Sequence, residues 1–319
     1  MTSDRPALVA FARQSIARGS KSFALASRLF DRTTRERVWL LYAWCRACDD
    51  LADAQDHGRQ EHRGNRGPAD APEARLATIR TLTELALAGE PTGMPAFDAL
   101  GVVARECGLT RDMADDVIAG FALDAADWSP RGEADLLRYC YHVAGAVGVM
   151  MAVVMGVSPD DAETLDRACD LGIAFQLANI ARDLSEDDAA ERCYLPADWL
   201  AEADIPPGEQ MKPPYRAALL PLVERLCDLA RVYEGSARIG ARRLPFRARW
   251  AVLAAAGIYG AIACKVRAGG IHAWDHRVAT STPAKLGFVV RGLGQALAPG
   301  GAKTARPALS RRDFAQPPR

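Results

Sequence analysis

Apolar residues recur at helical spacing along most of the chain, and two of the helices they predict carry rows of polar residues. These two helices cover residues 33–54 and 172–188, and neither contains Pro or an internal Gly. Their remaining positions are too apolar for a solvated surface helix. The polar rows are therefore the first candidates for chemistry.

The first row consists of Tyr42, Arg46, Asp49 and Asp53, spaced i, i+4, i+7 and i+11. Asp49 and Asp53 lie only about 40° apart around a helix axis. Two like charges at this spacing cost an isolated helix roughly a few tenths of a kcal/mol, so helix stability does not explain them. A cation shared by the two carboxylates would explain why both are present. Asp50 lies about 100° away, where it supports the row or faces solvent.

The second row consists of Gln176, Asn179, Asp183 and Asp187, spaced i, i+3, i+7 and i+11, with Arg182 beside it. Carboxylate and amide oxygens suit Mg²⁺, which often shares its coordination with substrate phosphates. The alternative is a solvated polar face, which is the common explanation for one such helix. Two helices of this kind in one chain favour a metal and diphosphate site.

Other helical patterns occupy residues 5–30, 73–88, 94–107, 110–127, 133–157, 215–241 and 247–267. The first is interrupted at residues 18–23, and residues 55–73 are polar, rich in Gly and Pro and predict a loop. No convincing strand period and no repeat appears. The pattern predicts an all-α protein.

Two local features could serve a ligand. Ser20, Lys21 and Ser22 follow a Gly at a helix boundary and offer hydroxyls, an ammonium and free N–H groups to an anion, although a plain helix cap is the simpler interpretation. Gly145 and Gly148 interrupt an apolar helix, where they would admit a second helix or a long ligand close to the backbone.

Composition narrows the function and the compartment. The 319 residues carry 40 basic and 40 acidic side chains, so gross charge does not suggest a nucleic-acid partner. Eight scattered cysteines and the absence of a signal-peptide pattern lead us to expect a cytoplasmic protein with reduced thiols. Cys45 and Cys48 lack the further ligands of a zinc site. The longest apolar run, residues 143–157, is shorter than the ~20 residues of a spanning helix.

The C-terminal end is basic and rich in Gly and Pro. We expect one catalytic domain over residues 1–298, followed by a disordered tail over residues 299–319. The tail is either solvated or a contact with an anionic membrane surface.

Several of these stretches together resemble the squalene and phytoene synthase family. The motifs are Ser20-Lys-Ser-Phe23, Leu41-Tyr-Ala-Trp-Cys-Arg-Ala-Cys-Asp-Asp-Leu-Ala-Asp53, Tyr139-Cys-Tyr-His-Val-Ala-Gly-Ala-Val-Gly148, the row from Gln176 to Asp187, and Arg192-Cys-Tyr-Leu-Pro196. The resemblance covers most of the chain. One departure is Glu191, where relatives usually have Gly.

The resemblance implies a single-domain bundle of the isoprenoid synthase type, in which two acidic helices face each other across a deep apolar cavity. It implies Mg²⁺, with Mn²⁺ as a substitute ion, and no nicotinamide cofactor. The implied metal ligands are Asp49, Asp53, Asn179, Asp183 and Asp187. The implied substrate-binding residues are Ser20, Lys21, Ser22, Phe23, Arg46, Gln176 and Arg182, and the implied catalytic residues are Tyr42, Arg46, Tyr139 and Tyr259.

The activity implied is the head-to-head condensation of two geranylgeranyl diphosphates, through a cyclopropylcarbinyl diphosphate, to phytoene. The partners implied are this substrate, and a membrane surface or a downstream desaturase as peripheral contacts. One alternative is a C30 enzyme of the same family acting on farnesyl diphosphate, and another is a non-catalytic lipid-binding or assembly relative. A di-iron carboxylate bundle is excluded because the chain has no Glu-x-x-His pair.

Overall fold

The computed structural model describes residues 4–53, 55–56, 59–60, 71–126, 128–298 and 306–315, and they are almost entirely helical. This confirms the all-α prediction. The chain divides into two compact units, an N-terminal unit of Met1–Ala126 with Val149–Leu165 and a C-terminal unit of Asp127–Gly148 with Asp166–Arg319. The single domain expected over residues 1–298 stays a prediction.

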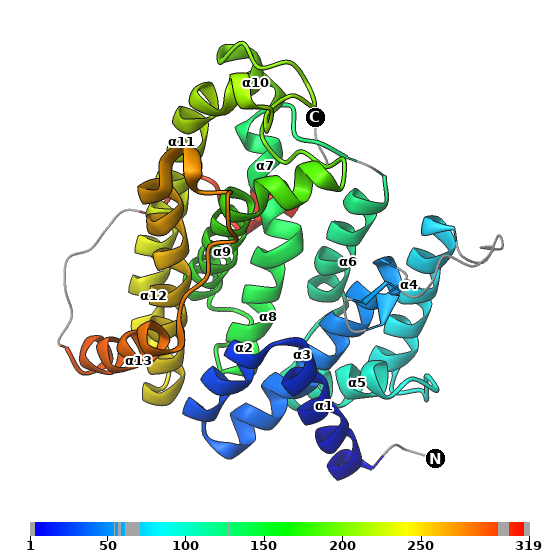
Figure 1. Cartoon of the computed structure of the whole chain (residues 1–319). Helices are drawn as coiled ribbons and strands as arrows, with labels where there is room; N and C mark the ends of the chain where they lie inside the picture. The colour runs from blue at the N-terminus through cyan, green and yellow to red at the C-terminus, as the bar shows by residue number, and fades with distance from the viewer. Residues whose placement is uncertain are drawn as a thin grey trace. The chain divides into compact units, whose positions relative to one another are not determined.

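The N-terminal unit is a bundle of helices (Figure 1). Its elements are α1 (Arg5–Gly19), α2 (Lys21–Ala26), the 3₁₀ helix η1 (Ser27–Leu29), α3 (Arg32–Asp53), α4 (Pro72–Ala88), α5 (Pro95–Cys107) and α6 (Arg111–Ala125). Two-residue strands β1 (Gln55–Asp56) and β2 (Arg59–Gln60) pair antiparallel after α3, in the segment expected to be a loop.

Helix α3 is held inside this bundle by apolar side chains on one face and by ion pairs at its start. Leu40, Leu41 and Trp44 are completely buried, and the Trp44 indole donates to Thr83 Oγ1 on α4 at 3.3 Å. Near the N-terminal end of α3, Glu36 accepts from Arg5 of α1 at 2.7 Å. These contacts fix the helix that carries the first acidic row.

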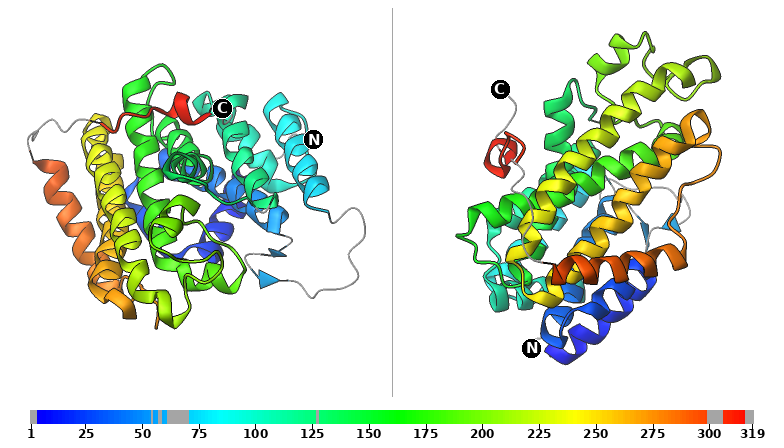
Figure 2. Two further views of the ribbon diagram at one scale, coloured as in Figure 1. Left: turned by 90° about the horizontal axis from the view of Figure 1, so that it is seen from above. Right: turned by 90° about the vertical axis from the view of Figure 1, so that its left-hand side faces the viewer.

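The C-terminal unit is built from longer helices. They are α7 (Glu133–Cys140), the π-helical turn η3 (Tyr141–Gly145), α8 (Ala146–Val154), α9 (Ala162–Ala189), α10 (Ala197–Glu202), the 3₁₀ turn η4 (Pro213–Tyr215), α11 (Arg216–Gly240), the 3₁₀ turn η5 (Ala241–Arg243), α12 (Phe246–Gly269), the 3₁₀ turn η6 (Gly270–His272), α13 (Thr282–Leu297) and α14 (Arg311–Ala315). Both α8 and α9 pass from one unit into the other. Figure 2 shows α11 and α12 side by side.

Small residues allow the segment from Tyr141 to Gly148 to press against α9, as the glycines predict. A Cβ atom added at Gly148 would lie 2.6 Å from the Ala168 carbonyl oxygen, and one at Gly145 would lie 3.0 Å from Cys169 Sγ. The close neighbour is therefore a helix, and it is the helix that carries the second acidic row.

Helices α9 and α13 differ from the prediction. Helix α9 begins at Ala162, ten residues before the predicted start at residue 172, because Asp161 caps it by accepting from the Thr164 amide at 3.1 Å. Helix α13 was not predicted, because Pro283 and three glycines interrupt its pattern.

The expected disorder of the tail is wrong for residues 306–315. Arg306 donates to the completely buried Asp170 carboxylate of α9 at 3.0 and 2.9 Å. Phe314 of α14 is buried and stacks on Tyr141 at 5.8 Å between ring centroids. Paired charge and buried aromatic area order this segment. Residues 299–305 and 316–319 lie outside the described residues.

Two helical stretches among the described residues, Glu133–Val154 and Phe246–His272, are long and apolar enough to cross a membrane by length and composition. Buried core helices meet the same criterion, and 67% of the first window is buried. This observation alone does not indicate a membrane-spanning protein.

Candidate active site

The first acidic row is organised around one guanidinium. Arg46 Nη1 lies 2.8 Å from Asp49 Oδ2, and Arg46 Nη2 pairs with Asp50 Oδ1. Asp50, which helix geometry placed about 100° away from the row, is therefore a direct partner of Arg46. The Arg46 and Asp50 side chains are largely buried, whereas the Asp49 side chain keeps 46% of its area exposed. Asp53, one turn further on, is exposed.

The folded protein makes the Asp49 carboxylate costly to ionise. Desolvation by surrounding protein raises the Asp49 pKa to about 6; Arg46 opposes the rise, and Asp53, Asp50 and Asp124 add to it. Asp124 lies on α6, and its approach was not visible in the sequence. A carboxylate that is costly to ionise yet open to solvent suits an incoming cation.

The turn between α1 and α2 lies beside this row. The Tyr42 hydroxyl sits where a side chain at Gly19 would be, and Arg46 Cδ is 3.7 Å from that position. Phe23 packs edge-to-face on Tyr42, with ring centroids 5.7 Å apart. Ser20, Phe23, Tyr42 and Arg46 are thus brought together.

Ser20 itself caps α2, because its Oγ accepts from the Phe23 amide at 3.2 Å. This is the simpler of the two roles considered for it, and it aims the first turn of α2. The side chains of Lys21 and Ser22 lie outside the described residues, so their contact with an anion stays a prediction.

The second acidic row contains a polar atom without a partner. Asn179 Oδ1 is buried and accepts no hydrogen bond from any described residue. A buried acceptor left in this state costs about 1–3 kcal/mol, which a ligand can recover. One turn on, Arg182 Nε donates to Asp183 Oδ1 at 2.7 Å.

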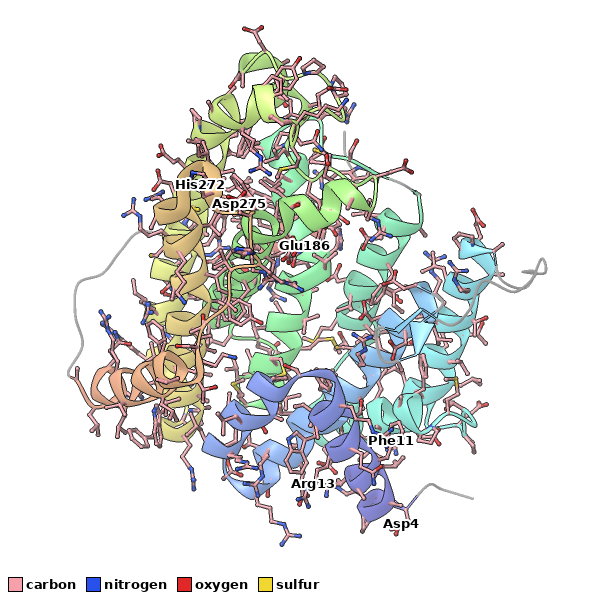
Figure 3. All side chains as sticks on the ribbon, viewed as in Figure 1. Asp4, Phe11, Arg13, Glu186, His272 and Asp275 are labelled. Atoms are coloured by element: carbon pink, nitrogen blue, oxygen red, sulfur yellow. The ribbon has the colours of Figure 1, made fainter. Side chains whose placement is uncertain are left out.

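Arg277 is a member of this site that sequence reasoning missed. It lies in the loop before α13, and its Nη2 donates to Asp183 Oδ1 at 3.0 Å. Its Nε is 3.7 Å from Glu186 Oε1. Figure 3 shows Glu186 of α9 near the loop that carries Asp275. The contact joins residues 94 positions apart, so no periodic pattern in the sequence predicts it.

Asp187, at the end of the row, has a larger pKa shift than Asp49 on α3. Desolvation and the neighbouring Asp183 raise its pKa to about 7, while Arg192 and Arg182 oppose the rise. Arg192 belongs to the segment that follows α9, so the two motifs meet here. As in the first row, the carboxylate lacks full compensation by protein charges.

Glu191 occupies a backbone position that favours Gly. It has φ 58°, and the amides of Glu191 and Arg192 donate to the carbonyls of Asp188 and Asp187 at 3.0 and 2.8 Å. This pattern is the Schellman motif, whose left-handed position favours Gly. A Glu there carries about 1–2 kcal/mol of backbone strain, and the motif nevertheless forms.

The aromatic residues fall into two groups. The Tyr139 ring is buried and stacks with Trp128 and with Tyr194, with ring centroids 5.6 and 4.8 Å away. Phe175 of α9 immediately precedes Gln176 in the sequence. Tyr259 stacks on Phe175, with ring centroids 4.0 Å apart. A cavity of about 70 Å³ lies beside this pair, well below the roughly 300–1,000 Å³ of a typical ligand pocket.

The donor chemistry of both rows fits a magnesium ion. All the candidate ligands are hard oxygens, and Asn179 Oδ1 is an unused buried acceptor. Among the residues that the structure describes, no three His, Cys, Asp or Glu side chains converge closely enough to hold a metal ion. Either row would therefore have to share such an ion with oxygens from elsewhere, for example from a diphosphate.

This fold is that of the head-to-head prenyl synthases. The chain matches a ligand-bound dehydrosqualene synthase with TM-score 0.79 and 26% identity, covering 91% of this chain and 96% of that one. It matches a squalene synthase of Alicyclobacillus acidocaldarius with TM-score 0.72 and 23% identity, covering 83% and 95%.

Sequence comparison defines the family. Residues 16–284 match the squalene/phytoene synthase family model. The chain is 47% identical to a phytoene synthase of Pseudescherichia vulneris over 95% of both chains, and 46% identical to a 15-cis-phytoene synthase of Pantoea ananas over 92% and 94%. The protein therefore belongs to the squalene/phytoene synthase family.

Proposed function

We propose that this protein joins two geranylgeranyl diphosphates head to head to give phytoene, as a geranylgeranyltransferase of carotenoid biosynthesis. The observation that carries the proposal is its 47% identity, over 95% of both chains, with a protein named phytoene synthase. Both acidic rows that the resemblance requires are present in the sequence. The expected compartment is the cytoplasm.

Asp49, Asp53, Asn179, Asp183 and Asp187 would hold Mg²⁺, which when bound neutralises charge on a departing diphosphate. The chain adds positive charge of its own for that purpose. Arg46 on α3, Arg182 on α9 and Arg277 in the loop before α13 each already bind a carboxylate. Exchanging a carboxylate for a phosphate oxygen preserves the geometry these guanidinium groups prefer.

The first substrate loses its diphosphate to leave an allylic carbocation, and the double bond of the second substrate captures it to give a cationic adduct. Loss of a proton from that adduct closes the three-membered ring of the cyclopropylcarbinyl diphosphate. That species ionises, rearranges and loses a proton to yield phytoene. Each cation must be kept from water by apolar and aromatic walls. The stacked Phe175 and Tyr259, next to Gln176 on the acidic helix, supply such a surface in the C-terminal unit.

The second candidate is a C30 enzyme that uses farnesyl diphosphate. It is favoured by the fold match to a dehydrosqualene synthase, although the more similar relatives carry the name phytoene synthase. A non-catalytic lipid-binding relative is disfavoured because both polar rows are intact. Contact with a downstream desaturase, or with a membrane through the basic tail, is a further expectation of the resemblance.

Incubation of the purified protein with Mg²⁺ and either geranylgeranyl or farnesyl diphosphate, without a reductant, tests the proposal. We expect phytoene from the C20 substrate and loss of product with EDTA. A C30 hydrocarbon as the main product would move the protein to the second candidate. Absence of any product, with Mg²⁺ or Mn²⁺ present, would contradict an enzymatic role.

A further inference from the structure

Helix α13 has an outward face without a single charged or polar side chain. The exposed residues on that face lie within a sector of about 100° around the axis. We call them the α13 face: Pro283, Leu286, Gly287, Val290, Gly294 and Leu297. Leu286 is 52% exposed, Val290 70% and Leu297 68%. Large apolar side chains exposed together on one face commonly mark an interaction surface, so this face is suited to a covering partner.

The opposite side of α13 is fixed to α12, which keeps the face in place (Figures 1 and 2). The Trp250 indole donates to the Val289 carbonyl at 2.7 Å. A side chain at Gly292 would lie 2.9 Å from the Ala254 amide nitrogen. The face is therefore a rigid surface of the C-terminal unit and not a loosely attached segment.

The sequence around the face is strongly basic. Residues 241–298 contain one acidic residue, Asp275, against nine basic ones: Arg242, Arg243, Arg247, Arg249, Lys265, Arg267, Arg277, Lys285 and Arg291. Two of the nine, Arg267 and Arg277, pair with Asp228 and Asp183 outside this segment, and the basic excess remains without them. Arg291 is exposed on α13 itself, and Arg247 is exposed at the start of α12 beside Phe246. Arg249 donates to the Ala296 carbonyl at 3.3 Å, which places this basic end of α12 next to the end of the face.

We propose that the α13 face binds an anionic lipid bilayer, lying in the headgroup region with its apolar residues inserted. An apolar helix face flanked by Lys and Arg is the composition that interfacial helices share. At 16 residues, α13 is too short to span a bilayer, which needs about 20. A second copy of the chain is the poorer occupant, because a two-fold contact would bring the same basic residues together.

This surface differs from the basic tail suggested by the sequence, since Arg306 and Arg311 are engaged with acidic residues of α9. The inference also does not depend on the proposed reaction, because it concerns exposed residues of α13 and the charge around them. It extends the function by giving the protein a defined side toward the membrane.

Sedimentation of the purified full chain with vesicles tests the proposal. We expect the chain to pellet with phosphatidylglycerol-containing vesicles and to remain in solution with pure phosphatidylcholine. The double substitution Leu286→Glu with Val290→Glu should weaken the partition coefficient at least tenfold, since two inserted apolar side chains become charged. Arg291→Gln should weaken it by about fivefold.

Val232→Glu is the matched control, because Val232 is 49% exposed on α11 and outside the α13 face. It should bind vesicles as the unchanged chain does. Circular dichroism melting establishes that all variants are folded. Equal binding by the double variant, or failure of the unchanged chain to bind anionic vesicles, overturns the proposal. A dimer that the double variant dissociates, without vesicle binding, overturns it in favour of contact between copies.

Discussion

The two acidic helices carry similar rows of residues, but the carboxylates of the two rows are neutralised by different arginines. On α3, the cation comes from within the helix, since Arg46 pairs with Asp49 and Asp50. On α9, Arg182 pairs with Asp183, and Arg277 from a distant loop binds the same carboxylate. The first row is therefore set by one helix, whereas the second also depends on the loop that precedes α13.

The difference implies that an incoming ion or diphosphate encounters differently held arginine side chains at the two rows. At α3 an incoming ligand shares the acidic residues with a neighbour of fixed position on the same helix. At α9 it must displace, or recruit, a guanidinium that is 61% exposed. Three sets of substitutions test this comparison, in order of decreasing expected effect.

Asp49→Ala and Asp183→Ala should each reduce turnover by about 10³-fold or more, because both rows are needed to compensate charge on the departing diphosphate. Steady-state assays with the C20 substrate measure the loss, and far-UV circular dichroism establishes that the helices remain. If one of the two variants keeps near-normal turnover, its row takes no part in the chemistry and the comparison fails.

Arg277→Gln should reduce kcat/KM by about tenfold to a hundredfold, the range expected when a charge-assisted contact is lost. Arg267→Gln is the control, since Arg267 is an exposed arginine paired with Asp228 at 2.7 Å. Its kcat/KM should change by less than about twofold. Equal effects of the two substitutions would show that Arg277 has no special role at the α9 row.

Asp187→Asn should raise Tm at pH 8 by about 2–4 °C without metal, and Asp49→Asn by less. Their folded pKa values, about 7 and about 6, lie above the ordinary 3.8. Each carboxyl therefore destabilises the fold as pH rises from about 4 through its folded pKa. The gain should disappear as pH falls below about 3, where the carboxyl is protonated in both the folded and the unfolded state. A lower Tm at pH 8 would contradict the desolvation argument.

The main helices and the two acidic rows could be predicted from the sequence, because both follow from helical spacing. Gln176, Asn179, Asp183 and Asp187 share one face for that reason alone. Arg277 could not be found in this way, since its contact with Asp183 spans 94 residues and depends on the path of a loop.

At the C-terminal end, composition alone gave the wrong expectation for residues 306–315. Gly and Pro suggested disorder, but a single buried partner, Asp170, binds Arg306. Helix α13 was missed for a related reason, because its glycines weaken the helical pattern, while one of them, Gly292, allows close packing on α12. Local propensity could not anticipate these tertiary contacts.

The pairing of Arg306 with Asp170 also has a consequence for synthesis of the protein. The two residues are 136 positions apart, so a nascent chain has made all of α9 well before Arg306 leaves the ribosome. Until then Asp170 has Ser236 as a hydrogen-bond partner but lacks its cation, and removing one partner of a buried ion pair costs roughly 3–5 kcal/mol. The C-terminal unit therefore reaches its full stability only after translation has passed this residue.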